Sequence, residues 1–258
     1  MMAMRRTAWL IVALLVLGAV CRLVLRSNVQ HDAARQFPWP VPDYRLAEHS
    51  HVVLPDGRIR LNITHLPLAG ISPDMLNWWY RELPIAQVRV NGKMYPFYHL
   101  FHLTEHGRIW LEEPAFDGKP GMGVGALVAR REWFGSYESA GAGRISEMSA
   151  QGMAIHPEIA GIAFGTIRHG YQPTPDGSRY TLQSTIGVDW PIVAPAINAL
   201  LRKSQFPDAM LVQWERHQIE EVAMLNYFLP ELYSQRNSGH YHLEFAESAL
   251  LMPARDKQ

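Results

Sequence analysis

Two polar side chains lie in the hydrophobic face of a predicted C-terminal helix. The apolar stripe that contains Met210, Trp214 and Phe228 has the alternating four-and-three spacing of a buried helix face, and His217 and Glu221 occupy two of its positions. Residues at i and i+4 project from one side of a helix, and zinc accepts both imidazole nitrogen and carboxylate oxygen. A core hydrogen bond is the alternative, but a buried carboxylate needs a compensating cation or donor. The pair therefore predicts part of a metal site.

Two other segments offer further ligands of the same kinds. The segment "YHLFHLTEHGRIW" is rich in histidine, with three residues between His102 and His106. In "ARREWFG", Glu132 precedes two aromatic residues, although a salt bridge with Arg130 or Arg131 would also account for this carboxylate. Each of these side chains taken alone is more simply explained as a surface or hydrogen-bonding group. The metal site therefore depends on several of them meeting in the fold.

The composition limits the other possibilities. The 258 residues carry 24 Lys and Arg against 24 Asp and Glu, and 48% are hydrophobic, which is enough to bury the core of one large domain. No basic block interleaved with aromatic residues is present, which argues against nucleic acid as a partner. The single cysteine, Cys21, excludes a disulfide framework and a cysteine-rich zinc site. A metal would therefore be held by histidine and carboxylate side chains.

Residues 1–26 form a separate hydrophobic segment in the sequence. Arg5 and Arg6 precede the apolar run "TAWLIVALLVLGAVC". If Arg22 extends to the interface, the span up to Leu25 is nearly long enough to cross a bilayer, and no clean cleavage site follows it. We therefore expect a single-pass N-terminal membrane anchor, with an exported soluble protein after signal cleavage as the alternative. Basic residues at both ends leave the side of the membrane open.

The rest of the chain is expected to form a linker and one domain. Residues 27–45, with "FPWPVPDY", have the composition of an extended linker, and the domain follows at 46–258. "HVVLPDGRIRLNITHL" is typical of a hairpin with its turn at Pro55-Asp56-Gly57. "SPDMLNWWYREL" indicates a helix with Ser72 as its N-cap and Pro73 at its first position.

Further strands and a long helix complete the predicted domain. The strand-like segments are "YPFYHLFHL", "RIWLEEPAF", "VGALVARREWF", "IAGIAFGTIRHGYQ" and "SRYTLQSTIGVDW", and the helix covers roughly 207–234. Antiparallel strands followed by one long C-terminal helix predict an α+β fold of the helix-grip type, with a curved sheet around the helix. Such a fold encloses a cavity between sheet and helix, and His217 and Glu221 would point into it.

Several segments resemble the 2,4-diacetylphloroglucinol hydrolase family over most of residues 50 to 235. They are "MLNWWY", "YHLFHLTEH", "REWFG", "TPDGSRYTLQSTIGV" and "HQIEEVAMLNYFLPELY", of which the double-tryptophan helix and the last helix are the most specific. The resemblance implies a Bet v 1-like helix-grip fold. It also implies a Zn²⁺-dependent enzyme that hydrolyses the carbon–carbon bond between an acyl group and an aromatic ring.

The resemblance also implies a ligand set of two histidines and two glutamates. His217 and Glu221 match the family's helical pair, and His106 matches the strand histidine that ends a His-x-x-x-His segment. Glu132 matches the second glutamate by its Glu-x-x-Gly context, and we expect it to be the fourth ligand. Glu138 fits the family's spacing better and stays the alternative.

Two further residues match positions that contact substrate in the family. Tyr98 precedes His106 by eight residues, as the family's substrate-contacting tyrosine does, and His169 falls where the family has a pocket histidine. The family's pocket asparagine is Ile109 here, so we expect a less hydroxylated, more apolar substrate than diacetylphloroglucinol. The N-terminal hydrophobic segment is a second departure from the family.

The expected function is therefore hydrolysis of an acyl group from a phenolic or β-diketone-like carbon. Zinc would supply an activated water and polarise the acyl carbonyl, and Tyr98 and His169 would stabilise charge on the phenolic oxygens of the leaving group. The partners would be a small phenolic or acyl-ketone substrate and, through the N-terminal segment, a membrane. A non-catalytic module that binds a hydrophobic ligand at a membrane is the alternative, and a purely structural metal site is a third possibility. The sequence does not indicate an oligomeric state.

Overall fold

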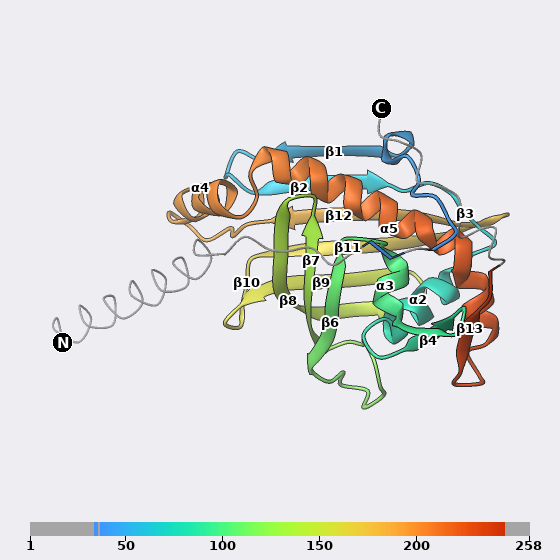
Figure 1. Cartoon of the computed structure of the whole chain (residues 1–258). Coiled ribbons are helices and arrows are strands. Elements are labelled where there is room, and N and C mark those ends of the chain that lie inside the picture. The colour runs from blue at the N-terminus through green and yellow to red at the C-terminus, as the bar shows by residue number, and fades with distance from the viewer. Residues whose placement is uncertain (1–33, 36, 246–258) are drawn as a thin grey trace.

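A long antiparallel sheet curves around one helix in the computed structural model, which describes residues 34, 35 and 37–245 (Figure 1). The main path of the sheet has the order β1 (Glu48–Val53), β2 (Ile59–Thr64), β12 (Gly177–Ile186), β11 (Gly165–Thr174), β9 (Gly152–Ile159), β8 (Tyr137–Ser149), β7 (Leu127–Phe134) and β6 (His106–Glu113). Two short strands, β3 (Leu68–Ala69) and β10 (Ile162–Ala163), pair with β12 and β9. This is the helix-grip, Bet v 1-like class predicted from the sequence.

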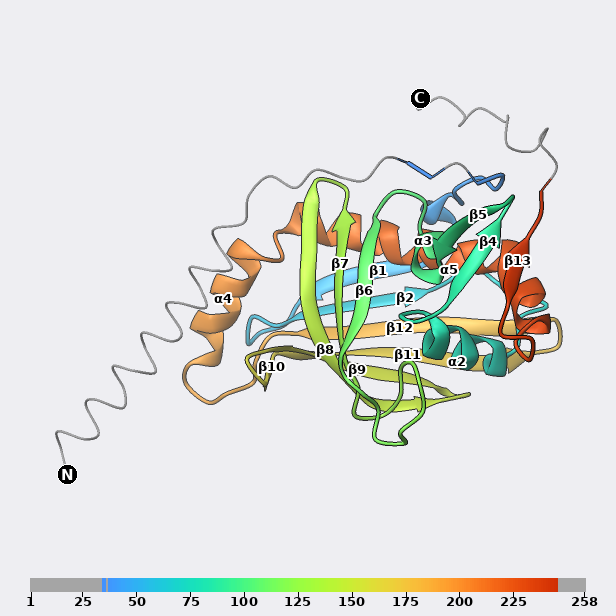
Figure 2. The same cartoon turned by 60° about the horizontal axis from the view of Figure 1, so that its bottom comes forward.

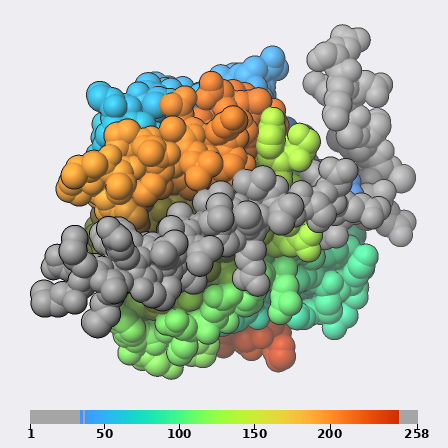
Figure 3. Space-filling view, turned by 90° about the vertical axis from the view of Figure 1, so that its left-hand side faces the viewer, coloured from blue at the N-terminus to red at the C-terminus, as the bar shows by residue number. Residues whose placement is uncertain are grey.

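The sheet bends strongly along its length. Figure 2 shows β6, β7 and β8 running across the direction of β1, β2 and β12, so that the two ends of the sheet face α5 (Asp208–Ser234) from different sides. The predicted hairpin between β1 and β2 is confirmed, and its turn contains Gly57 at φ 81°, a backbone conformation that glycine adopts without strain. The hairpin and α4 (Ala194–Ser204) lie next to each other on the face shown in Figure 3.

The long helix α5 supplies much of the core, as its apolar stripe predicts. Met210, Trp214 and Phe228 are buried, and so are His217 and Glu221 in the same stripe. Because the bent sheet surrounds the helix, residues outside a single narrow stripe are buried as well. The two polar side chains therefore lie inside the protein, on the helix face that the sheet encloses.

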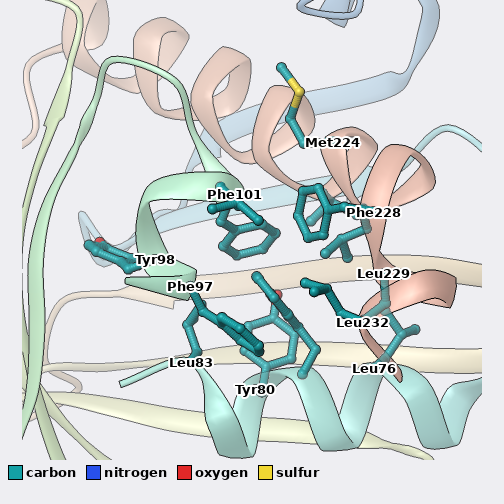
Figure 4. Close-up of a cluster of buried hydrophobic side chains, with 14 of the residues drawn as sticks. Leu76, Tyr80, Leu83, Phe97, Tyr98, Phe101, Met224, Phe228, Leu229 and Leu232 are labelled. Atoms are coloured by element: carbon teal, nitrogen blue, oxygen red, sulfur yellow. The ribbon is translucent and has the colours of Figure 1, made fainter. Parts of the chain in front are cut away.

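A layer of smaller elements closes one end of the sheet. It consists of α2 (Pro73–Glu82), α3 (Phe97–Phe101) and a small sheet of β13 (Tyr241–Leu243), β4 (Gln87–Val90) and β5 (Lys93–Pro96). Ser72 caps α2, accepting a hydrogen bond from the backbone N–H of Met75, and Pro73 is in the first turn, as predicted. Figure 4 shows side chains of α2 and α3 packed against Phe228, Leu229 and Leu232 of α5.

The prediction of a strand over "YPFYHLFHL" is wrong beyond its first two residues, because α3 replaces the strand there. Only Lys93–Pro96 is extended, and the helix that follows buries Phe97, Tyr98, Leu100 and Phe101. A short apolar run that is buried on several sides has no period that separates strand from helix. The helix turns the ring of Tyr98 away from those of Phe97 and Phe101 in Figure 4, although all three residues are buried.

The second half of the predicted linker is not a free spacer. Phe37 and Trp39 are buried in the main core, and the Trp39 ring stacks on Tyr227 with the ring centroids 6.0 Å apart. Arg35 donates hydrogen bonds to the backbone carbonyls of Leu103 and His106. Aromatic rings gain several kcal/mol of burial energy only when packed, so this stretch is part of the domain, and a short 3-10 helix, η1 (Tyr44–Leu46), leads from it to β1.

The predicted membrane localisation is corrected by the structure. No helix within residues 34, 35 and 37–245 combines the length and apolar character needed to cross a bilayer. Residues 1–26, which carried the prediction of an anchor, lie outside the described residues. The prediction of a membrane-anchored protein is therefore wrong for the part of the chain that the structure describes.

Candidate metal centre

The four side chains predicted as metal ligands meet between α5 and the strands β6 and β7. The Nε2 atoms of His106 and His217 lie 3.2 Å apart. Glu221 Oε2 lies 3.1 Å from the first of these nitrogens and 3.6 Å from the second. Glu132 Oε2 lies 3.9 Å from His106 Nε2 and 4.0 Å from His217 Nε2. All four residues are buried.

These separations suit a four-coordinate ion. Four ligand atoms at zinc's usual bond lengths of about 2.0–2.1 Å in a tetrahedron lie roughly 3.3 Å from one another. The observed distances of 3.1 to 4.0 Å bracket that value. The described residues therefore contain a buried group, His106, Glu132 and His217, that could hold a metal ion, and Glu221 lies against both of its imidazoles.

The electrostatics of the four side chains also suit a cation. Burial, together with the charge of Glu132, raises the pKa of Glu221 well above its usual range. Burial lowers the pKa of both His106 and His217, so each imidazole is neutral near pH 7. Neutral imidazoles are the form that binds metals, and a carboxylate that is costly to ionise without a counter-charge gains a favourable partner in a divalent cation.

Hydrogen bonds orient both imidazoles towards the centre of the group. His106 Nδ1 donates to the backbone carbonyl oxygen of Tyr98 at 2.8 Å, because α3 ends just before the strand that carries His106. His217 Nδ1 donates to Glu105 Oε2 at 2.8 Å. With Nδ1 occupied in this way, the Nε2 atom of each ring is left as a ligand atom, which is the usual arrangement around metal-binding histidines.

Glu105 is itself held by a second layer of charged groups. Its Oε1 accepts hydrogen bonds from the backbone N–H of Gly135 at 2.9 Å and from Arg216. Arg216 also donates to Glu220, whose Oε2 lies 3.2 Å from His102 Nε2. Because His102 Nδ1 accepts from backbone N–H groups, its Nε2 carries the hydrogen and donates to Glu220. His102 therefore supports the centre through this layer.

Glu220 lies off the apolar stripe of α5 and is nevertheless buried, where it is paired with His102 and Arg216. The bent sheet and the segment before β6 cover this side of α5 as well, so the position is enclosed and needs its charge partners.

Glu132 is fixed by a hydrogen bond to each of its oxygens. Tyr98 donates its hydroxyl hydrogen to Oε2 at 2.6 Å, and Arg130 Nε donates to Oε1 at 2.5 Å. Glu138, the alternative ligand, pairs across the β7–β8 ladder with Trp133, which is on the opposite face of β7 from Glu132. Its carboxylate accepts a hydrogen bond from Arg131 at 2.9 Å. The geometry thus assigns Glu132, and not Glu138, to the group.

A cavity of about 100 Å³ is lined by Glu132 and Glu221, the two carboxylates of this site. It is bounded by α2, α3, α5 and the inner face of the sheet, and its lining is mostly apolar, including Phe101, Ile109 and Met153. Trp79 lies in the core and not in the lining of the cavity. Tyr98 and His169, the two predicted donors, both line the cavity.

His169 begins a buried chain of hydrogen bonds. Its Nδ1 lies 2.6 Å from the Tyr180 hydroxyl, which lies 2.6 Å from the Tyr80 hydroxyl, and Tyr80 also lines the cavity. Burial, followed by the charge of Arg130, lowers the pKa of His169 to about 3, so its ring is neutral near pH 7. Burial raises the pKa of both tyrosines. The chain therefore consists of neutral groups that can donate or accept a proton.

The sequence reasoning missed Glu105 and left Arg130 as one of two possible partners of Glu132. Glu105 precedes His106 directly, but its role follows from a contact with a helix 112 residues away, which no local pattern reveals. Arg130 could have been chosen over Arg131, because strand residues two apart share a face and Glu132 was already assigned to the inside. The alternative of a salt bridge to Arg130 or Arg131 is resolved in favour of Arg130, at 2.5 Å.

Comparisons with known proteins show similarity to solved structures. No family model and no curated protein matches the chain. A protein of unknown function from Staphylococcus aureus is 11% identical, with a TM-score of 0.37 over 73% of this chain and 98% of that one. Ara h 8.0201 is 12% identical, with a TM-score of 0.36 over 65% and 97% of the two chains. CalU16 from Micromonospora echinospora is 13% identical, with a TM-score of 0.34 over 69% and 98%.

Proposed function

We propose that this protein is a zinc-dependent hydrolase that cleaves the carbon–carbon bond between an acyl group and a phenolic or β-diketone-like carbon. The observation that carries the proposal is the convergence of His106, Glu132 and His217, with Glu221 against both imidazoles, beside a mostly apolar cavity. A resemblance in sequence motifs to a family with this chemistry supports the same reaction.

These four side chains would hold the zinc ion. When bound there, zinc would lower the pKa of a water molecule and polarise the acyl carbonyl. The second-layer contacts of Glu105 and of the Tyr98 carbonyl would keep the two imidazoles in their binding tautomers.

The reaction adds one water molecule across the broken bond. The acyl carbon gains the hydroxyl group and leaves as a carboxylic acid, and the ring carbon gains a hydrogen. The pair of electrons from the broken bond remains on the ring carbon, so that carbon must be protonated, and its charge must be delocalised onto ring oxygens. The neutral chain of His169, Tyr180 and Tyr80 would hold a proton at the edge of the cavity for this step.

Tyr98 has a defined position in this scheme. Its ring stacks on the His106 imidazole with centroids 3.9 Å apart, and its hydroxyl donates to Glu132. Since Tyr98 also lines the cavity, it would position a metal ligand and a substrate ring together.

Product analysis tests the proposal directly. The full-length protein, loaded with zinc, is incubated with acylphenols graded by hydroxyl number, and the carboxylic acid and the deacylated phenol are quantified. In D₂O, the phenol should carry one deuterium at the carbon that lost the acyl group. We expect cleavage of weakly hydroxylated members. Activity that rises with every added hydroxyl would contradict the expected substrate preference.

The same panel addresses the alternative function. A module that only binds hydrophobic ligands would take up these compounds in its cavity without releasing acid. If protein with full zinc occupancy cleaves no member of the panel, the hydrolase proposal is overturned in favour of that module.

A further inference from the structure

Arg130 is a charged residue on the concave, cavity-facing side of the sheet. Strand β7 alternates, so that Val128, Arg130 and Glu132 share the inner face, and all three line the cavity. Arg131, the residue after Arg130, is on the outer face, where it pairs with Glu138. Among the described residues that line the cavity, Arg130 is the only lysine or arginine.

The guanidinium group is only partly used by the protein. Its Nε donates to Glu132, and Nη2 reaches Ser139 Oγ only at 3.5 Å, which is longer than a normal N–H···O hydrogen bond. Within the described residues, Nη1 has no hydrogen-bond acceptor. The side chain is 31% exposed and lines the cavity.

The residue opposite Arg130 is apolar. Ile109 on β6 is paired with Arg130 in the strand register, and its side chain lines the same cavity. Residues directly opposite each other on paired strands have Cβ atoms about 4.5–5.5 Å apart. Ile109 has no polar side-chain atom, so the guanidinium supplies the polar contact at this level of the cavity wall.

We propose that Arg130 binds the anionic oxygen of a phenolate or enolate substrate, so that the cavity selects ligands with one ionised oxygen on an otherwise apolar ring. A guanidinium and an oxyanion form charge-assisted hydrogen bonds, which are about twice as strong as neutral ones. If the protein is the proposed hydrolase, on which this part of the inference rests, Arg130 would also stabilise the charge that moves to this oxygen when the ring carbon leaves. Tyr98 is less suited to that task because its hydroxyl already donates to Glu132.

Neutralising Glu132 is the competing role for Arg130. A residue that only positions Glu132 would change zinc affinity and stability, but it would not make the cavity prefer a charged ligand over an uncharged one of similar size. The preference for an anion therefore separates the two roles, even where a substitution also affects the metal.

The first experiment measures this preference by binding. Dissociation constants of 4-nitrophenol and nitrobenzene are measured for the full-length protein at matched zinc content, and absorbance reports the ionised fraction of the bound phenol. We expect wild type to prefer the phenolate and Arg130→Gln to lose that preference by roughly 10- to 100-fold. Arg130→Lys should retain part of it, and Arg131→Gln, on the outer face, should retain all of it.

Several outcomes would overturn the proposal. Equal losses of affinity for both ligands in Arg130→Gln would indicate a structural role alone. An unchanged preference for the phenolate in Arg130→Gln would show that the guanidinium does not bind the anion. The anion would then bind at the metal. If Arg130→Gln does not fold, Arg130→Lys and wild type decide, because a wild-type protein without preference for the phenolate contradicts the proposal by itself.

The binding result is separable from the proposed reaction. A preference that depends on Arg130 in a protein that cleaves no acylphenol would sustain the anion site and reject the hydrolase. Cleavage with kcat unaffected by Arg130→Gln, and with no loss of phenolate preference, would sustain the hydrolase and reject the anion site.

Discussion

The Nε2 atoms of His106 and His217 lie 3.2 Å apart although the two residues are 111 positions apart in the sequence. Neither ring is charged near pH 7, because burial lowers the pKa of both. Two nitrogen lone pairs facing each other at this distance repel unless a proton or a metal ion lies between them. This relationship is the reason to expect a cation at the centre, and it leads to the first prediction.

Removing the helical pair should abolish zinc binding. We expect about one zinc per chain in the wild-type protein and almost none in a His217→Ala, Glu221→Ala double variant, because half of the ligand set is lost. Metal content of the full-length protein, measured by inductively coupled plasma mass spectrometry, checks this. His156→Ala, a histidine that bonds Ser146 outside the site, is the matched control. Full occupancy in the double variant would show that the metal lies elsewhere.

Glu105→Gln should weaken zinc binding without removing a ligand. The carboxylate accepts the Nδ1 hydrogen of His217 at 2.8 Å, and such outer partners are typically worth about 10- to 100-fold in metal affinity. Competition with a chromophoric chelator measures the affinity. The control is Glu113→Gln, because the Glu113 side chain is 55% exposed. This substitution should leave the zinc affinity unchanged. Equal affinities in both variants would refute a role for Glu105.

Tyr98→Phe should lower turnover more than it lowers zinc occupancy. The substitution keeps the ring that stacks on His106 and removes the hydroxyl that donates to Glu132. At saturating zinc we expect a loss of up to about a hundredfold in kcat, because the hydrogen-bond partners of metal ligands are typically worth about 10- to 100-fold in activity. Steady-state kinetics with metal analysis on the same samples checks this, with Tyr137→Phe as the control. If Tyr98→Phe keeps the wild-type kcat at full zinc occupancy, the Tyr98 hydroxyl has no role in the reaction.

His65 should make the protein less stable at mildly acidic pH. Neither ring nitrogen has a hydrogen-bond partner among the described residues, and burial lowers the pKa of His65 from 6.5 to about 3. Above pH 6.5 the ring is neutral in both folded and unfolded chains. As the pH falls towards 3, the unfolded chain takes up a proton that the folded protein refuses, so stability is lost at about 1.4 kcal/mol per pH unit.

His65→Phe should reduce this pH dependence. Between pH 7 and pH 5 we expect the substitution to remove roughly 2 kcal/mol of the loss in unfolding free energy, while keeping the edge-to-face contact with Tyr180. Urea unfolding at the two pH values measures the effect, and His240→Phe, at an exposed position, should not change the slope. An unaltered slope in His65→Phe would mean that His65 is already protonated or solvated in the fold.

The sequence by itself determined the elements that follow from local pattern. The turn around Gly57 joins the first hairpin, and Ser72 with Pro73 begins α2, because these residues favour the required backbone geometry wherever they occur. The spacing around His217 and Glu221 identified the inner face of α5, since helical periodicity depends only on neighbours along the chain. Family-like motifs added His106 and Glu132 as partners for that pair.

Only the tertiary structure decided which side chains meet and which elements enclose them. Glu138 was excluded because strand pairing puts it on the face opposite Glu132, and register is set by the whole sheet. Tyr98 became helical because its apolar segment packs against α5, and a short apolar run carries no period that selects strand or helix. Glu105 reached His217 through the bend of the sheet around the helix. Contacts between residues more than a hundred positions apart depend on this curvature, which no local stretch of sequence encodes.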